Sequence, residues 1–286
     1  MGLIGIPVFI AMVLGGGFWF FALILILSNL CLWEYFAIAK AKQTYPLKAI
    51  SYLMNTAFIA IVFWTMQSEN TELFLPLLLT GILTNSVLHT GLNLWNKLPN
   101  VTLNIAMGQS GFNYITLFFS ALLLISDFGN VSTSLMNISN SPFTYIPNTD
   151  WSFVVLAFFV AIWSSDTFAY FVGSAIGKHR LFERVSPKKS WEGAIAGFFG
   201  AIIGFALVTH FAVPNFPMQL SIILGAVIGV VGTIGDLAES QLKRDAGIKD
   251  SSNIIPGHGG VLDRFDSILF TAPVVLIVLI IYSIIS

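Results

Sequence analysis

The sequence predicts an all-α, polytopic transmembrane helical protein, and three observations support this fold class. Hydrophobic residues make up 56% of the chain and charged residues only 9%, whereas soluble domains carry roughly 25% charged residues. Apolar runs near the length of about 20 residues that spans a bilayer recur along the chain. The charged residues gather mainly between these runs. A lipid bilayer is therefore the expected solvent.

About nine apolar segments are predicted to enter the membrane. The first is short, and Gly15-Gly16-Gly17 separates it from the second, so the pair fits either a hairpin or one re-entrant unit. No cleavable signal is expected, because no basic stretch precedes the first segment. The nine segments are residues 3–14, 18–39, 50–66, 73–94, 103–126, 151–173, 191–213, 218–240 and 267–285.

The positive charges orient these segments. All 13 Lys and Arg residues follow even-numbered segments, and the connections 67–72, 127–150 and 214–217 contain none. The positive-inside rule then places the N-terminus and the four basic connections in the cytoplasm, and the C-terminus outside. The polar connection 127–150 is expected to be exposed and flexible.

The chemistry is predicted to lie in the second half of one integrated membrane domain. Residues 1–150 are interpreted as a helical scaffold, and residues 151–286 as the region that carries the site. Glu34 stands beside two aromatic residues, so we assign it to an interfacial belt rather than to a ligand set. Cys31 is the single cysteine, which excludes an internal disulfide.

Ionisable side chains within membrane segments indicate function, because each costs about 2.5–3.5 kcal/mol on insertion scales. Asp166 lies in the sixth segment, among Ser and Thr residues. It is either a carboxylate that faces a wet cavity or a member of a polar cluster that packs helices.

A second polar group leaves the eighth segment. Asp236, Glu239, Ser240 and Lys243 fall on one face of a helix, because residues three and four apart are neighbours. Interfacial anchoring explains Lys243 and the adjacent Arg244, since long cationic side chains reach the headgroups. It does not explain two acids one turn deeper.

A glycine-rich stretch follows. The backbone amides of Gly257, Gly259 and Gly260 can approach an anion and form a nest for phosphate oxygens. Lys249 and Arg264 bracket this stretch and would share the phosphate charge.

Acids and a histidine accompany these glycines. Asp263 and Asp266 offer oxygen ligands to a hard cation, and carboxylates with substrate phosphates are the usual Mg²⁺ environment. His258 is assigned a positioning or phosphate-contact role, because an ionised phosphate nucleophile needs no base.

A further basic stretch, Ser186-Pro-Lys-Lys-Ser-Trp-Glu-Gly193, opens the seventh segment. Ser190 is predicted to cap the helix, with Glu192 in the first turn. Such a helix start offers free amides to an anion. Plain anchoring of Lys188 and Lys189 at the inner surface is the alternative. Glycines that repeat on the seventh and eighth segments predict close helix contacts, namely Gly193, Gly197, Gly200, Gly204, Gly225, Gly229, Gly232 and Gly235.

These motifs resemble the phosphatidate cytidylyltransferase (CDP-diacylglycerol synthase) family. Ser240-Gln-Leu-Lys-Arg244, Lys249-Asp250 and Pro256-Gly-His-Gly-Gly-Val-Leu-Asp-Arg-Phe-Asp266 fit the signature of that family in type and spacing. The Ser186–Gly193 stretch resembles its other polar block. The N-terminal half matches only as apolar helices, and a bare Met1 stands where members carry a basic leader.

The resemblance implies transfer of CMP from CTP to phosphatidic acid, which gives CDP-diacylglycerol and pyrophosphate for phospholipid synthesis. It implies Mg²⁺ dependence (with a second cation as an option), a homodimer, membrane lipid but no nucleic acid as partner, and a bacterial inner membrane with the active site on its cytoplasmic side. Metal-binding acids of the family fall on Asp236 and Asp263, with Asp166, Glu239 and Asp266 as further candidates. Phosphate and substrate contacts are expected from Lys188, Lys189, Ser190, Ser240, Lys243, Arg244, Lys249, His258, Gly259, Gly260 and Arg264.

Two other functions compete with this interpretation. A CTP-dependent lipid kinase would use the same nucleotide but transfer its γ-phosphate. A transporter with an intramembrane ion site belongs to another class, but most of the charge lies toward one face rather than at the midplane, and no inverted repeat is evident.

Overall fold

The computed structural model is a bundle of membrane-length helices with one small β-hairpin. It describes residues 2–68, 74–135, 143, 151–252, 254 and 259–285. The helices of the first half are α1 (Gly2–Gly15), α2 (Gly17–Ala41), α3 (Lys48–Gln67), α4 (Phe74–Leu92), the 3₁₀ turn η2 (Asn93–Trp95), α5 (Val101–Gly111), the π-helical turn η3 (Phe112–Thr116), α6 (Leu117–Ile125) and α7 (Phe128–Leu135). The second half contains α8 (Trp151–Ile176), β1 (Arg180–Phe182), β2 (Ser186–Ser190), α9 (Trp191–Ala212), α10 (Met218–Asp245) and α11 (Leu262–Ile285).

Seven helical segments in the described part of the chain are long and apolar enough to cross a membrane. They are α2, α3, the continuous run from α5 to α6, α8, α9, α10 and α11. The other two predicted segments correspond to the shorter helices α1 and α4. Many large apolar side chains on the spanning helices are exposed, as lipid-facing surfaces require. The chain is an integral membrane protein, whereas a count of nine crossings and the cytoplasmic N-terminus stay predictions.

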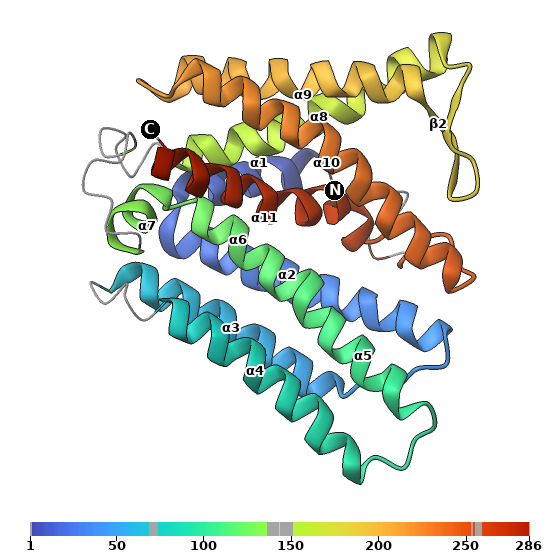
Figure 1. Cartoon of the computed structure of the whole chain (residues 1–286). Coiled ribbons are helices and arrows are strands. Elements are labelled where there is room, and N and C mark those ends of the chain that lie inside the picture. Colours follow the sequence, from blue (N-terminus) through green and yellow to red (C-terminus); the bar gives the residue numbers. More distant parts are fainter. Residues whose placement is uncertain are drawn as a thin grey trace.

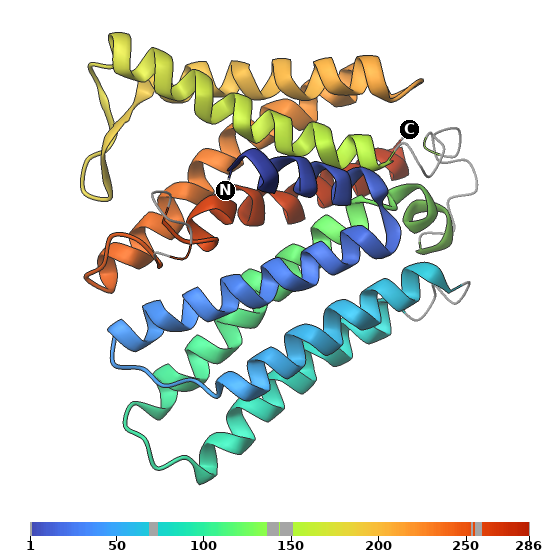
Figure 2. The same ribbon diagram turned by 180° about the vertical axis from the view of Figure 1, so that it is seen from behind.

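The connections that carry Lys and Arg lie together. Figures 1 and 2 show the link from α2 to α3, the link from α4 to α5, the β-hairpin and the C-terminal end of α10 at the same end of the bundle. The short link between α9 and α10 lies at the opposite end. The bundle therefore has one end at which its basic residues gather.

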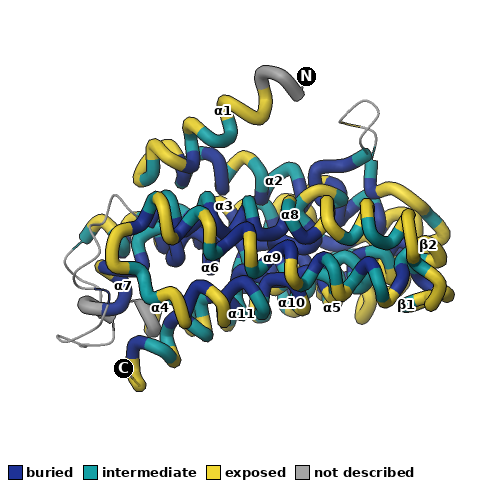
Figure 3. Tube along the Cα trace, turned by 90° about the horizontal axis from the view of Figure 1, so that it is seen from above, coloured by how far each residue is buried: buried dark blue, intermediate teal, exposed yellow. Residues whose placement is uncertain are grey.

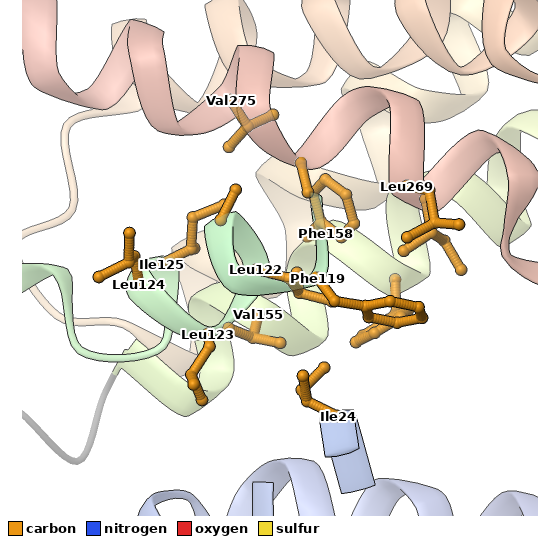
Figure 4. Close-up of a cluster of buried hydrophobic side chains, with 14 of the residues drawn as sticks. Ile24, Phe119, Leu122, Leu123, Leu124, Ile125, Val155, Phe158, Leu269 and Val275 are labelled. Atoms are coloured by element: carbon orange, nitrogen blue, oxygen red, sulfur yellow. The ribbon is translucent and has the colours of Figure 1, made fainter. Parts of the chain in front are cut away.

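The core surrounds α6. Every residue from Phe119 to Ile125 is buried, and these side chains meet Ile24 of α2, Val155 and Phe158 of α8, and Leu269 of α11 (Figure 4). Figure 3 shows buried positions running through the interior, while α1 lies at one edge, where it packs on α2 and α8. The core thus joins the N-terminal helices to the helices that carry the predicted site.

Close helix contacts at the predicted glycines are confirmed. A Cβ on Gly225 would lie 2.5 Å from the Cα of Ile202, and one on Gly229 would lie 2.8 Å from the Cα of Phe198. Both glycines are on α10 and both contacted residues are on α9, so the two backbones touch. Small residues allow α8, α9 and α10 to bring their polar ends close together.

Two expectations about local structure are corrected. The all-α prediction missed the antiparallel pair of β1 and β2. The connection 127–150 is not simply exposed, because α7 occupies part of it and Phe128 and Phe143 are fully buried against Trp151. For residues 136–142 and 144–150 the prediction lies outside the described residues.

The eighth and ninth segments extend beyond their apolar windows. α10 continues to Asp245, and α11 begins at Leu262, five residues before the predicted start. Asp263 and Asp266 are therefore held on a helix rather than in the connection before it, and Lys243 lies on α10 as its predicted helical face requires. Helical hydrogen bonding continues past the hydrophobic run, which is why hydropathy alone misplaced these ends.

Candidate active site

A pocket of about 590 Å³ opens where α8, the β-hairpin, α9, α10 and α11 meet. We call it the hairpin pocket. Five predicted site residues line it: Asp166, Lys188, Lys189, Ser190 and Asp236. Ser165, Arg180 and Ser267 also line it, and sequence reasoning did not assign them to the site. Arg180 lies in the basic connection before the seventh segment, and that position is the sequence signal that could have assigned it to the site.

Lys189 and Asp236 join the hairpin to α10. The Lys189 ammonium donates to Oδ2 of Asp236, and both side chains are about one-third exposed. Ser240, one turn further along α10, donates to Oδ1 of Asp236 at 3.3 Å. An acid and a base from distant segments therefore face the same pocket.

The start of α9 forms another wall of the pocket. Ser190 Oγ accepts from the amide of Gly193 at 3.2 Å, which confirms the predicted helix cap. Glu192 in the first turn accepts from Nδ1 of His179 at 2.7 Å when that nitrogen carries the proton. These contacts fix the hairpin against the helix, so that its two lysines stand over the pocket.

A second group of site residues lies further along α10. The Lys243 ammonium is 2.5 Å from Oε2 of Glu239 and 2.7 Å from Oδ1 of Asp263. Glu239 is completely buried, and the side chains of Lys243 and Asp263 are each only 9% exposed. A single cation thus joins an acid of α10 to an acid of α11 in a water-poor environment.

Asp263 also organises the segment before α11. Its carboxylate accepts from the amide of Ser251 at 3.1 Å and from the amide of Gly260 at 2.8 Å. Gly259 has φ +82°, a conformation that favours glycine. The Gly260 amide, predicted to contact phosphate, is therefore directed at Asp263 in this structure.

Glu34 was assigned wrongly to an interfacial belt. Its side chain is fully buried and accepts from Oγ of Ser251 and Ser252, at 3.0 and 2.6 Å. It also accepts from the amides of Val261 and Leu262, at 2.8 and 2.5 Å. Its aromatic sequence neighbours suggested an interface, whereas its partners lie 217 to 228 residues further along the chain. We call Glu34, Ser251, Ser252, Gly260, Val261, Leu262 and Asp263 the loop anchor.

The remaining predicted residues lie around these two groups. Asp266 is buried. It lies close enough to Asp236, Lys189 and Asp166 to interact electrostatically with their charges. The charge of Arg264 likewise interacts electrostatically with Asp166. Arg244 is exposed and donates to the carbonyl of Ile248, and Lys249 is exposed. Gly257 and His258 lie outside the described residues.

The two acids that were expected to share a cation have different partners in this structure. Asp236 lines the hairpin pocket, whereas Asp263 belongs to the loop anchor and is not among the residues that line this pocket. Lys243, two turns along α10 from Asp236, is the cationic partner of Asp263.

The donor set of the hairpin pocket fits a magnesium ion in one particular way. No three His, Cys, Asp or Glu side chains of the described residues are placed to hold a metal ion. Asp166, Asp236 and the hydroxyl of Ser165 nevertheless line one pocket. Mg²⁺ usually takes one or two carboxylates and completes its shell with water and substrate phosphates. The pocket offers that incomplete shell.

The fold and the site define an integral membrane protein with an acid-and-base pocket at the basic end of its helices. The sequence profile of the cytidylyltransferase family matches residues 1–282. The chain belongs to this family.

Named relatives support the same family assignment. The chain is 33% identical over 289 residues to the phosphatidate cytidylyltransferase of Synechocystis sp., which covers 95% of this chain and 92% of the relative. It is 44% identical over 125 residues to that of Haemophilus influenzae, covering 42% of this chain and 43% of the relative. For the Staphylococcus aureus protein of the same name, identity is 41% over 140 residues, covering 48% of this chain and 53% of the relative.

Proposed function

We propose that this protein is a phosphatidate cytidylyltransferase, which transfers CMP from CTP to phosphatidic acid and produces CDP-diacylglycerol and pyrophosphate. The observation that carries the proposal is the hairpin pocket, which Lys188, Lys189 and Arg180 line together with Asp166 and Asp236. Its apolar walls and its position within a membrane protein suit a lipid substrate, and relatives of the chain bear this name.

The reaction is an in-line displacement at phosphorus. A phosphate oxygen of phosphatidic acid attacks the α-phosphorus of CTP, and a new P–O bond forms. The bond from the α-phosphorus to the oxygen that bridges to the β-phosphate breaks, and pyrophosphate leaves with that oxygen. Such a reaction requires little covalent chemistry from the protein, so positioning and charge stabilisation are its main tasks.

The basic residues supply the charge that two polyanions need. Two phosphates a few Å apart repel each other by several kcal/mol in a partly dry site. Lys189 donates to Asp236 in the structure, and in the proposed complex it turns to a phosphate oxygen. Lys188 and Arg180 line the same pocket, and in the proposed complex they would contact the leaving pyrophosphate group. Ser190 lines the pocket, and its hydroxyl can donate to a phosphate oxygen while it accepts from the amide of Gly193.

Magnesium is proposed as the cofactor. Asp236 and Asp166 would hold it, with Asp266 beside them and Asp263 as the further acid expected from the family resemblance. When bound, the cation neutralises phosphate charge and orients the triphosphate. A second cation near Glu239 and Asp263 would compete with Lys243 for their oxygens.

The setting of the enzyme follows the same proposal. We place the basic end of the bundle, and with it the hairpin pocket, on the cytoplasmic side of a bacterial inner membrane, because that side attracts Lys and Arg. CTP would then enter from the cytoplasm and the lipid from the bilayer. A homodimer is expected from the family resemblance.

The position of the transferred label tests the proposal. Purified protein in lipid nanodiscs is given phosphatidic acid, Mg²⁺ and CTP labelled with ³²P at either the α- or the γ-phosphate. We expect α-label in the lipid, γ-label in pyrophosphate, and equal amounts of the two products. Transfer of the γ-label to lipid would instead identify a lipid kinase, and no reaction with CTP would favour the transporter.

A further inference from the structure

Glu34 lies in the half of the chain that sequence analysis treated as scaffold, yet it contacts the segment that leads into α11. A buried carboxylate is costly unless donors surround it. Glu34 has two hydroxyl donors and two amide donors, which matches the roughly four lone-pair positions of a carboxylate. Among the described residues, no Lys, Arg or His forms an ion pair with it. Neutral hydroxyl and amide donors, rather than a cation, therefore stabilise the Glu34 carboxylate.

Two of these donors belong to the start of a catalytic helix. The amides of Val261 and Leu262 come immediately before and at the first residue of α11. The first amides of a helix have no partner within the helix, and a negative charge there is favourable. Glu34 thus supplies from α2 the cap for α11, which carries Asp263 and Asp266.

Ser251 shows how this cap is coupled to the site. Its hydroxyl donates to Glu34 at 3.0 Å, and its amide donates to Asp263 at 3.1 Å. Ser251 therefore donates one hydrogen bond to an acid of α2, Glu34, and another to an acid of α11, Asp263. Gly260 lies between them, because an added Cβ would stand 2.0 Å from Oγ of Ser251 and 2.6 Å from Oε2 of Glu34.

We propose that Glu34 is a positioning residue of the transferase: through Ser251, Ser252 and the start of α11 it fixes Asp263 and its partner Lys243 for catalysis. This role rests on the proposed function. Glu34 itself acts at a distance from the hairpin pocket and is not among the residues that line it. The N-terminal helices thereby become part of the catalytic machinery rather than a passive support.

Amide hydrogen exchange tests the contacts of Glu34 in the loop anchor in the absence of substrate. We compare the wild type with Glu34→Gln, which keeps the size of the side chain but replaces an acceptor by an NH₂ that faces donors. Hydrogen bonds to charged groups are the stronger ones, so exchange in peptides that contain Ser251 and Gly260–Leu262 should accelerate on the order of tenfold. Exchange in the β-hairpin should not change. Wild-type exchange rates at Gly260–Leu262 in Glu34→Gln would overturn the proposal.

Kinetics and a matched control separate positioning from general loss of stability. Asn55 is another fully buried polar residue of the N-terminal half, where it contacts Ser28 and Thr116. Asn55→Ala should lower the melting temperature and leave exchange at Gly260–Leu262 unchanged. Glu34→Gln should lower kcat about tenfold with a smaller change in the KM for CTP, and Glu34→Asp should recover part of kcat.

The outcomes remain distinguishable from failure of the proposed function. If Glu34→Gln and Asn55→Ala have the same pattern of exchange and the same kcat, Glu34 is merely structural and the inference is wrong. If the wild type transfers no CMP, the proposed reaction is wrong, whereas the exchange comparison still decides whether Glu34 holds the start of α11.

Discussion

The ammonium nitrogen of Lys243 on α10 lies 2.7 Å from Oδ1 of Asp263 on α11, and each side chain is only 9% exposed. Glu239 shares the same cation at 2.5 Å. Removing one partner of a buried ion pair leaves an uncompensated charge, which is far more costly than losing a surface pair. The consequences of this arrangement can be measured.

Lys243→Met should strongly destabilise the protein. We expect the free energy of unfolding to fall by about 3–5 kcal/mol, because two buried acids lose their cation. Lys42→Met is the matched control, since Lys42 pairs with Asp245 at the surface and such pairs contribute about 0–1 kcal/mol. Thermal melts in the same detergent compare the two variants. Equal melting temperatures would show that the buried Lys243 pair contributes no more stability than the surface Lys42 pair.

Asp236→Asn and Asp263→Asn are each expected to abolish CMP transfer while the protein remains folded. Their stabilities should differ, because Asp236 is partly exposed whereas Asp263 holds Lys243 and two backbone amides. We therefore expect a lower melting temperature for Asp263→Asn than for Asp236→Asn. Rates of label transfer and thermal melts measure both effects. Robust activity in either variant would remove that residue from the site.

Asp166→Asn should change the magnesium dependence of the reaction. Asp166 lines the hairpin pocket with Asp236, so its loss would leave a weaker oxygen shell for the cation. The Mg²⁺ concentration that gives half the maximal rate should rise, on the order of tenfold for a lost ligand contact. Titration of Mg²⁺ at fixed CTP measures it. An unchanged Mg²⁺ requirement would argue that Asp166 only packs helices, the alternative that its Ser and Thr neighbours suggested.

Much of this architecture could be predicted from sequence, because its signals are local. Apolar runs marked the membrane helices, and Ser190 with Glu192 marked the start of α9. Glu34 could not be interpreted in this way, because its partners are 217 or more residues away and nothing in its neighbourhood encodes them. The different partners of Asp236 and Asp263 likewise depend on how the hairpin, α10 and α11 pack, which spacing along the chain does not specify.

Gly260→Ala should reduce activity through steric conflict at the loop anchor. The new Cβ would lie 2.0 Å from Oγ of Ser251, so Ser251 or Glu34 must move. Gly91→Ala is the control, because no neighbouring atom lies within 4 Å of its added Cβ and Ala favours a helix by roughly 0.5–1 kcal/mol. Transfer rates should fall in the first variant and stay at the wild-type level in the second. Equal rates would mean that the anchor tolerates displacement.

Asp127 offers a test of pH dependence away from the membrane spans. Burial raises the pKa of its carboxyl from 3.8 to about 6, although a hydrogen bond from Asn130 lowers it. The folded state therefore holds the proton more tightly than the unfolded state. Its contribution to stability is fully present below the unfolded pKa and is lost as pH rises through the folded pKa.

Asp127→Asn should therefore stabilise the protein only at higher pH. Asn cannot ionise, and its side-chain oxygen can still accept from Asn130, which lies 3.0 Å away in the wild type. We expect similar melting temperatures for variant and wild type near pH 4, and a higher one for the variant at pH 7.5. Melts across this range measure the difference, which should grow between pH 4 and 6 and then level off. A constant difference at all pH values would mean that ionisation of Asp127 is not its cause.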